Sequence, residues 1–416
     1  MRAAIIGAGY SGTMAAVELA RAGCREVILI EKSGRFATGA AYSTSSPGHL
    51  LNVRAAQMSA FADAPDHFAR WAEQEGVGGP QDFVQRREFG RYLEGVLEGA
   101  PEVRRVTGEA IALENGAVRL DSGERVECDA VVLAGGNYPS RLPDMFGDEA
   151  VHDPWSAEGR EKVARLALAG GDLLLVGTGL TMVDMCVSLE EAGFGGRIVA
   201  TSRRGLVPRA HEERPAEVPE WVPPTRLAEL VGAVRARKPW RAAIDGLRPH
   251  SHDLWRGLSD SEKKRFLRHL RPWWDVHRHR IAPGVAKRIE AMRADRRLEV
   301  VAGRVRSVEG DEVTIARRGG GELRRRFAGV INCTGPEGNI LRVTDPLIRQ
   351  LLESGQARAE RLGLGLEVDE DSRVVGEGGS PELYAVGPLS KGSYWEIVAV
   401  PDIRGQVRDV ARAIAY

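Results

Sequence analysis

Residues 3–12 read Ala-Ala-Ile-Ile-Gly-Ala-Gly-Tyr-Ser-Gly, and this segment is the strongest indication of the fold class in the sequence. A short apolar run leads into the spacing Gly-x-Gly-x-x-Gly, and small or helix-forming residues follow it. Gly7 permits a tight turn, Gly9 lets a pyrophosphate approach the backbone, and Gly12 lets a helix pack against the strand. Because the first N–H groups of that helix have no partner within it, its N-terminus favours a phosphate. The stretch predicts a dinucleotide-binding βαβ unit.

The next apolar run, residues 27–31, ends in Glu31. One helix separates the glycine turn from this run, so Glu31 is expected at the tip of the neighbouring strand. A carboxylate there accepts hydrogen bonds from both hydroxyls of an adenosine ribose. The first unit is therefore predicted to bind an adenosine with free ribose hydroxyls. A glycine turn without a ligand is disfavoured, because the strand, turn, helix and acid all agree.

A second glycine turn lies in residues 173–182, which read Leu-Leu-Leu-Val-Gly-Thr-Gly-Leu-Thr-Met. Met182 replaces the third glycine of the motif, so helix and strand are expected to lie slightly farther apart. Ser202, Arg203 and Arg204 stand where the first unit has its acid. A hydroxyl and an arginine fork can donate to a 2′-phosphate, which a carboxylate would repel. The second unit is predicted to prefer NADPH over NADH, and the alternative is a solvated basic turn.

Composition narrows the class of protein. The chain has 416 residues, a formal net charge of zero and four scattered cysteines. Zero net charge argues against a general binder of nucleic acid or anionic membranes. The absence of a Cys-x-x-Cys motif argues against a redox disulfide pair and a zinc ribbon. No run of 18 apolar residues occurs, and the first expected strand leaves no room for a signal peptide, so we expect a soluble, cytoplasmic protein.

The two glycine turns open two similar halves, which predicts an α/β fold with two Rossmann-like dinucleotide-binding domains. In each half a strand-like meander follows the βαβ unit and leads into a buried strand that ends in small residues. We place the first part of the first domain at residues 1–149 and the second domain at residues 150–326. The C-terminal part of the first domain is placed at residues 327–416.

A mainly helical insertion is expected at residues 205–290 of the second domain. It is basic and holds five of the eight tryptophans. Ser259 and Glu262 form a capping-box pattern, which predicts a helix over residues 260–271. The proline-rich residues 208–224 are predicted to form an ordered loop.

A set of segments runs through nearly the whole chain: residues 7–12 with Glu31, 40–44, 49–53, 134–136, 177–179 with 202–204, 273–280 and 333–335. Together they resemble the flavoproteins with two dinucleotide-binding domains, and within them the FAD/NAD(P)-binding family related to flavin-dependent monooxygenases. The resemblance implies FAD at the first site and NADPH at the second. It places the isoalloxazine ring near residues 42–59 and 387–397. Gly135 departs from the threonine that relatives often carry there.

The resemblance also implies an FAD- and NADPH-dependent oxidoreductase. A hydride would pass from NADPH to FAD, and a hydroperoxyflavin would transfer one oxygen atom to a small substrate. Some relatives hydroxylate the amino groups of amino acids, so the substrate is expected to be acidic or to contain an amino group. One alternative is an NADPH reductase or oxidase that passes electrons to a partner or to oxygen, and another is a redox sensor. The expected partners are a small molecule and molecular oxygen, without nucleic acid or membrane.

The predicted cofactor-binding residues come from the two glycine turns, the strand tips and the segments near the expected flavin ring. They are Gly7, Gly9, Tyr10, Ser11, Gly12, Glu31, Lys32, Tyr42, Leu51, Asn52, Met58, Ser59, Ala134, Gly135, Gly177, Gly179, Leu180, Thr181, Ser202, Arg203, Arg204, Thr334, Gly335, Gly387, Trp395 and Ile397.

Three residues are predicted to be catalytic. Asn52 is a candidate donor to the flavin or to peroxide, and Trp395 and Glu396 lie just past the last expected strand. No side-chain nucleophile is required, because the cofactors carry the difficult chemistry. The alternatives are a turn asparagine for Asn52 and a core or interface position for Trp395.

Four basic residues of the insertion, Arg209, His211, His277 and Arg280, are predicted to hold substrate carboxylates. The alternative is a solvated basic helix face. No metal is expected at His277 and its neighbouring histidine, because neither an acidic nor a thiol cluster accompanies them.

Overall fold

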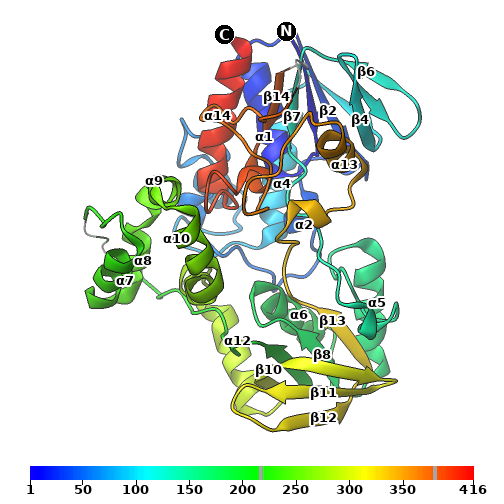
Figure 1. The fold of residues 1–416 in the computed structure, drawn as a ribbon, viewed down its shortest axis with the longest axis vertical. Helices are drawn as coiled ribbons and strands as arrows, with labels where there is room; N and C mark the ends of the chain where they lie inside the picture. Colours follow the sequence, from blue (N-terminus) through cyan, green and yellow to red (C-terminus); the bar gives the residue numbers. More distant parts are fainter. Residues whose placement is uncertain (215–217, 219, 378–381) are drawn as a thin grey trace.

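The computed structural model describes residues 1–214, 218, 220–377 and 382–416, and its fold is α/β with two sheets built on parallel strands. Figure 1 shows these sheets toward opposite ends of the molecule, with the helices of the insertion beside the region between them. The predicted fold class, two Rossmann-like domains with a mainly helical insertion, is confirmed.

Five parallel strands in the order β14-β7-β1-β2-β3 form the sheet of the first domain. Its central strands read as continuous apolar runs because both of their faces are buried. Helices α1 and α14 pack together, and the antiparallel sheet β4-β5-β6 shares a hydrophobic core with helix α13 and the first sheet. The strands are β1 Arg2–Ile6, β2 Glu26–Glu31, β3 Val103–Thr107, β4 Ala110–Glu114, β5 Ala117–Leu120, β6 Arg125–Glu127, β7 Ala130–Leu133 and β14 Glu382–Ala385. The helices are α1 Tyr10–Arg21, α2 Gly39–Tyr42, α3 His67–Gln74, α4 Arg86–Glu98, α13 Pro346–Glu353 and α14 Val400–Ala415.

The sheet of the second domain has the strand order β12-β11-β10-β9-β8-β13. Strands β13, β8, β9 and the first half of β10 are parallel, whereas β10, β11 and β12 form an antiparallel meander. Helices α6 and α12 pack together in this domain. The strands are β8 Leu173–Val176, β9 Ile198–Ser202, β10 Leu298–Glu309, β11 Glu312–Arg317, β12 Glu322–Arg326 and β13 Gly329–Asn332, and the helices are α5 Ala157–Ala169, α6 Leu180–Glu191 and α12 Pro283–Ala294.

The chain crosses between the domains twice, and the two crossings are joined by an antiparallel bridge between Pro139 and Pro336. The side chain of Asn332 donates to the backbone oxygens of Ser140 and His152 at 2.9 and 2.8 Å, which holds the first crossing against β13. Because β13 pairs with β8, residues 329–332 belong to the second sheet. The boundary expected at residue 327 is therefore a few residues too early.

The insertion consists of short helices α7 Leu227–Ala236, α8 Trp240–Gly246, α9 Ser251–Gly257, α10 Asp260–Arg265 and α11 Arg271–Arg278. The predicted capping box at α10 is present, since Ser259 and Glu262 exchange side-chain and backbone hydrogen bonds. One π-helical turn joins α10 to α11, so the helical segment extends past the predicted end at residue 271. Of the loop expected at residues 208–224, residues 215–217 and 219 lie outside the described part. Within the described part, no helix combines the length and apolar character needed to cross a membrane.

Candidate functional site

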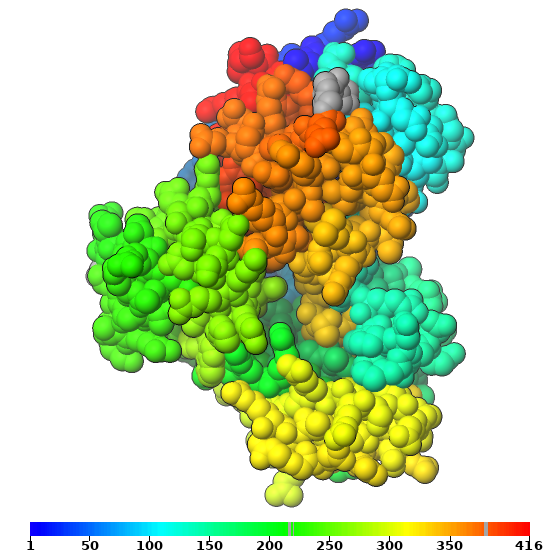
Figure 2. All heavy atoms as spheres, viewed as in Figure 1, coloured from blue at the N-terminus to red at the C-terminus, as the bar shows by residue number. Residues whose placement is uncertain are grey.

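A cavity of about 2430 Å³ lies between the two domains and the insertion. Figure 2 shows the face on which the green helices of the insertion, the orange C-terminal segment and the second domain surround a recess. The cavity is lined by the second glycine turn, by residues 51–54 of the first domain and by residues 267–269, 271–272, 275–276 and 278–280 of the insertion, among others. It therefore brings together segments that are far apart in the sequence.

The first glycine turn has the backbone geometry that a pyrophosphate requires. Gly7 has a φ of +97°, and a Cβ added there would lie 2.6 Å from the carbonyl oxygen of Ala134. A Cβ at Gly12 would lie 1.7 Å from the oxygen of Gly7, so helix α1 can approach β1 only with glycine there. Gly9 caps α1 without a side-chain hydrogen bond, which leaves the first N–H groups of the helix for a ligand.

The acid of the first unit lies beside this turn, as predicted. One carboxylate oxygen of Glu31 accepts from the backbone N–H of Ala8 at 2.9 Å, and the other accepts from the N–H and hydroxyl of Ser33. The neighbouring Lys32 is directed elsewhere, since its ammonium pairs with Glu109 at 3.1 Å. Glu31 is thus placed to receive a ribose, whereas Lys32 is already paired with another partner.

Other residues predicted at the first site lie close to α1. The hydroxyl of Tyr10 donates to the carbonyl oxygens of Ala60 and Val400 at 3.3 and 3.4 Å. A Cβ added at Gly387 would lie 2.7 Å from the hydroxyl oxygen of Ser11, so the tip of β14 passes directly over the start of the helix. The carboxyl ends of β1 and β14 therefore meet at this turn, as the topology of a parallel sheet requires.

The segment expected near the flavin ring lines the cavity in part. Tyr42, Leu51, Asn52 and Met58 line it. Ser59 is fully buried, and its hydroxyl donates to the carbonyl oxygen of Ala64 at 2.6 Å. This bond belongs to a network of polar contacts that holds the loop of residues 59–64 against helices α1 and α4 of the first domain.

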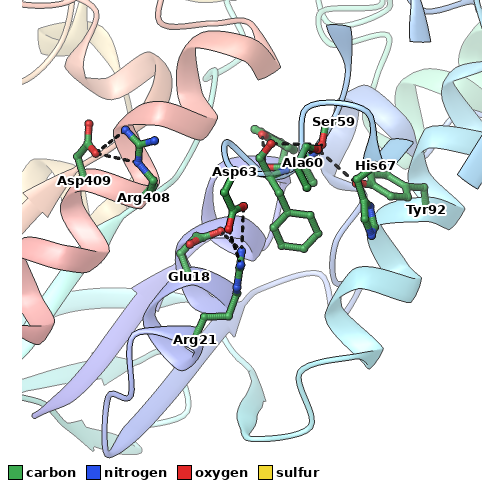
Figure 3. A network of polar contacts seen from close by, with 12 residues as sticks. Glu18, Arg21, Ser59, Ala60, Asp63, His67, Tyr92, Arg408 and Asp409 are labelled. Carbon is green, nitrogen blue, oxygen red and sulfur yellow. Dashed lines mark hydrogen bonds and ion pairs between the residues drawn. The ribbon is translucent and has the colours of Figure 1, made fainter. Parts of the chain in front are cut away.

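Figure 3 shows this network on the two sides of the loop. Arg21 pairs with Asp63 at 2.7 Å, and the hydroxyl of Tyr92 accepts from the backbone N–H of Ala60 at 3.2 Å and bonds His67 at 2.8 Å. The side chain of Ser59 thus orders the loop from within, and its carbonyl oxygen accepts from Arg404 at 3.2 Å.

The second glycine turn is open toward the cavity. Gly177 has a φ of +118°, and a Cβ there would lie 2.0 Å from the carbonyl oxygen of Cys333, so only glycine fits. Gly179 caps α6 without a side-chain hydrogen bond, and a Cβ there would meet no atom within 4 Å. Leu180 and Thr181, the first residues of α6, line the cavity. This helix end can accept a pyrophosphate from the cavity side.

The basic strand tip lies at the same end of the cavity. The hydroxyl of Ser202 bonds that of Thr178 at 2.8 Å, and Arg204 donates to the carbonyl oxygen of His269 at 3.2 Å. Arg203 is exposed and lines the cavity. Met182, the residue that breaks the glycine motif, is fully buried in the core of the domain.

Three further arginines at this end were missed by sequence reasoning. Arg304, Arg317 and Arg318 lie on the β10–β11 hairpin and line the cavity. The sequence predicts this hairpin only as a meander, and the pairing of β10 with β9 brings it beside Ser202. The paired basic residues 317 and 318 before the glycine run were the available signal.

The 333–335 segment closes this side of the site. The hydroxyl of Thr334 donates to the side-chain oxygen of Asn332 at 2.7 Å, and the hydroxyl of Ser140 donates to the carbonyl oxygen of Gly335 at 2.7 Å. Thr334 and Gly335 line the cavity. In the first domain the corresponding Ala134 and Gly135 are close to Gly7.

The residues predicted to hold a substrate are only partly brought together. His211 and Arg280 line the cavity, whereas Arg209 is exposed outside it. His277 turns away, since its ring bonds the carbonyl oxygen of Trp273 at 2.7 Å and packs edge-on against Trp240.

His211 and Arg280, which line the cavity, both already have a partner within the protein. The ring of His211 bonds the carbonyl oxygen of Asn52 at 2.9 Å, and Arg280 forms an ion pair with Asp245. Burial, and then the charge of Arg280, lower the pKa of His211 to about 4. A neutral imidazole at this position fits a structural contact with the segment that carries Asn52 better than it fits an anion receptor.

Two of the predicted catalytic residues do not face the cavity. Trp395 is buried and stacks on Trp255 at a ring distance of 4.6 Å. Glu396 is buried with a φ of +74°; it accepts from the indole N–H of Trp274 at 2.8 Å and pairs with Arg278 at 3.1 Å.

Burial raises the pKa of the Glu396 carboxyl, but the charges of His279 and Arg278 outweigh burial and hold it below its usual range. The side chains of Trp395 and Glu396 therefore hold the C-terminal loop against the insertion, whereas Ile397 is buried in the core of the first domain. Asn52 does line the cavity.

Comparison with known proteins agrees with this geometry. Residues 4–138 match the family model described as FAD-NAD(P)-binding. The reduced form of ornithine hydroxylase from Pseudomonas aeruginosa is 17% identical, with a TM-score of 0.68 over 100% of this chain and 98% of that one. An ornithine N-hydroxylase from Kutzneria sp. 744, described with reduced FAD, NADP⁺ and L-ornithine, is 15% identical, with a TM-score of 0.69 over 99% and 98%.

Thioredoxin reductase from Lactococcus lactis is 14% identical, with a TM-score of 0.54 over 99% of this chain and 97% of that one. These likenesses confirm the predicted resemblance at the level of the fold. The match of residues 4–138 agrees with the predicted cofactor class, FAD together with NAD(P).

Proposed function

We propose that the protein is an NADPH-dependent flavin monooxygenase that oxidises a small amine-containing substrate. The observation that carries the proposal is the cavity that joins the second glycine turn to Asn52 and Met58, two residues of the segment expected near the flavin ring. A hydride passes only between rings in contact, so in this proposal the nicotinamide and the flavin would share that cavity. When bound, FAD and NADPH would supply the redox chemistry.

The two helix N-termini and the charged side chains near them would hold the cofactors in this proposal. The N-terminus of α6 would hold the pyrophosphate of NADPH, and Arg203, Arg204 and Arg304 would surround its 2′-phosphate. The N-terminus of α1 and Glu31 would hold FAD. The insertion walls the cavity on one side and would limit the access of water to the reacting groups.

The cysteines argue against a disulfide reductase of the thioredoxin reductase kind. Cys128, Cys186 and Cys333 are buried and Cys24 is half-buried, and all four are free thiols. Burial raises the pKa of the Cys186 and Cys333 thiols well above the usual range, so neither is poised as a nucleophile. The neighbours that hydroxylate amines therefore suit the chain better than the reductases.

The first test is the cofactor. Protein purified without added flavin and then denatured by heat should release FAD in about equal amount to the chain, and NADPH should bleach the bound flavin in the absence of oxygen. Absence of FAD would refute the first site, and bleaching by NADH alone would refute the second.

The second test is the coupling of oxygen to product. With a true substrate, NADPH consumption should match hydroxylated product, and the yield of hydrogen peroxide should fall. If every amine and amino acid tried leaves all consumed oxygen as hydrogen peroxide, the protein is an NADPH oxidase or reductase instead.

A further inference from the structure

The cavity carries many more positive than negative side chains. Among the described residues that line it, seventeen are lysine or arginine and six are aspartate or glutamate. Near the insertion and the C-terminal loop, five of the arginines that line the cavity form ion pairs with carboxylates, which neutralise their charge. The pairs are Arg241–Glu212, Arg248–Asp402, Arg271–Asp275, Arg278–Glu396 and Arg280–Asp245.

Lys391 is the exception. It lines the cavity and is half-buried, and among the described residues its ammonium has neither a hydrogen-bond partner nor a carboxylate within ion-pair distance. The remaining lining cations without a carboxylate partner differ from it. They are either exposed, as at Arg203, Arg214, Arg268, Arg304, Arg318 and Arg342, or they donate to backbone carbonyls, as at Arg54 and Arg204.

The surroundings of Lys391 are apolar on one side and charged on the other. Its ammonium lies 4.9 Å from the centre of the Trp395 ring. Burial, and then the charge of Arg271, lower the pKa of Lys391, while Glu396 and Asp275 oppose that shift. Both acids already have an arginine partner. The ammonium therefore lacks a counter-ion of its own in a position where desolvation makes one valuable.

The backbone that follows Lys391 is held by contacts with the insertion. The indole N–H of Trp255 donates to the carbonyl oxygen of the next residue, Gly392, at 2.8 Å. Glu396, five positions on, is held by Trp274 and Arg278. Such anchoring fixes the backbone from which the Lys391 side chain extends, so only the side chain has to be ordered when an anion binds. The same loop follows β14, whose tip lies over the start of α1.

We propose that Lys391 is the receptor for a carboxylate of the substrate, so that the substrate is an amino acid rather than a simple amine. The inference rests on the proposed function and adds the substrate class to it. A carboxylate would supply the missing counter-ion and would keep the ammonium in the cavity. An amine without a carboxylate would instead bring a second positive charge next to Lys391, which disfavours it.

The experiment compares probes that differ by one carboxylate. Binding of L-ornithine against putrescine, and of L-lysine against cadaverine, is measured by calorimetry on the FAD-loaded protein with NADP⁺ present. L-aspartate serves as a third carboxylate probe. We expect at least one amino acid to bind ten-fold or more tightly than the corresponding amine, or, for L-aspartate, than both amines.

Two variants of Lys391 and a control variant test whether this residue causes the tighter binding of the amino acid. Lys391→Met should reduce the preference to less than three-fold, and Lys391→Arg should restore most of it, because a guanidinium also receives a carboxylate. Lys264→Met removes an exposed lysine on helix α10 that does not line the cavity, and it should leave the preference unchanged.

The inference and the proposed function fail in different ways. FAD content and anaerobic bleaching by NADPH report on the proposed function alone. If the protein passes those tests but no amino acid binds, or the amines bind equally well, or Lys391→Met keeps the full preference, then Lys391 is not the carboxylate receptor. A Lys391→Met protein with normal FAD content and melting temperature excludes misfolding as the reason for a loss.

Discussion

Arg86 of the first domain forms a bidentate ion pair with Asp184 of the second, in which its two terminal guanidinium nitrogens donate to the two carboxylate oxygens at 2.9 and 3.0 Å. The third guanidinium nitrogen donates to the carbonyl oxygen of Leu50 at 3.0 Å. Both charged side chains are mostly buried, with exposed fractions of 13% and 11%. The pair connects the start of helix α4 in the first domain to helix α6 in the second, whose N-terminus faces the cavity.

Replacing one member of this pair should loosen the domain junction. Arg86→Gln leaves a mostly buried carboxylate without its bidentate partner, and we expect a loss of about 3 kcal/mol of stability and a lower melting temperature. NADPH should also reduce the flavin more slowly. The double variant Arg86→Met with Asp184→Leu removes both charges and should recover part of the stability. Equal stability of Arg86→Gln and the unaltered protein would contradict this role.

The neighbouring His49 reinforces the same contact. Its ring bonds the hydroxyl of Thr44 at 2.7 Å on one side and the carbonyl oxygen of Asp184 at 3.0 Å on the other. Burial lowers the pKa of His49 although the nearby Asp184 opposes the shift. The 49–53 segment is thereby positioned against α6 by hydrogen bonds of a neutral ring.

The two glycines of the second turn should behave differently when a methyl group is added. Gly177→Ala forces a Cβ onto the oxygen of Cys333 at a positive φ, so this variant should unfold at a lower temperature. The Cβ of Gly179→Ala would have no atom of the described residues within 4 Å, so the melting temperature of this variant should stay the same. Its Cβ would instead stand where the pyrophosphate approaches, and the Kd for NADPH should rise about ten-fold. Thermal melting and NADPH titration separate the two effects.

The arginines at the tip of β9 should decide the choice between NADPH and NADH. Arg203→Ala with Arg204→Ala removes two donors to a 2′-phosphate, so the KM for NADPH should rise at least ten-fold while that for NADH changes little. Arg265→Ala, on the surface of α10 outside the cavity, is the matched control. Equal effects on the two nucleotides would show that the 2′-phosphate is not bound here.

The features that could be predicted from sequence are those in which local backbone geometry demands one residue type. Gly7 and Gly177 are required by positive φ angles and by carbonyl oxygens close to the missing Cβ, and both stand in recognisable spacing. Glu31 and Ser202 could be placed because a strand, a turn and a helix return the chain to the same sheet edge.

The features that were missed depend on how distant parts of the chain dock. Arg86 and Asp184 lie 98 positions apart, and nothing in either local sequence marks them as a pair. Trp395 and Glu396 were placed correctly after the last strand, but their side chains face the insertion, whose packing no local pattern reveals. Lys391 escaped notice because a missing counter-ion is visible only once its neighbours have been assigned to their partners.

The low pKa of His211 should make the stability of the protein depend on pH. The imidazole has a pKa of about 4 in the folded protein, because burial and the charge of Arg280 disfavour its protonated form, against about 6.5 in an unfolded chain. Between these values the unfolded chain binds a proton that the folded protein does not, so acid favours unfolding. The stabilising contribution is present above pH 6.5 and is lost as the pH falls toward 4.

Since the ring is partly exposed, we expect this loss to amount to about 1 kcal/mol between pH 7 and pH 5. Urea unfolding of His211→Gln should show a correspondingly shallower pH dependence, because glutamine does not titrate and its amide can still donate to the carbonyl oxygen of Asn52. His269→Gln alters an exposed ring at the cavity rim and should keep the full dependence. If the His211→Gln protein loses stability with acid as steeply as the unaltered protein, then His211 is not the group whose low pKa causes the pH dependence.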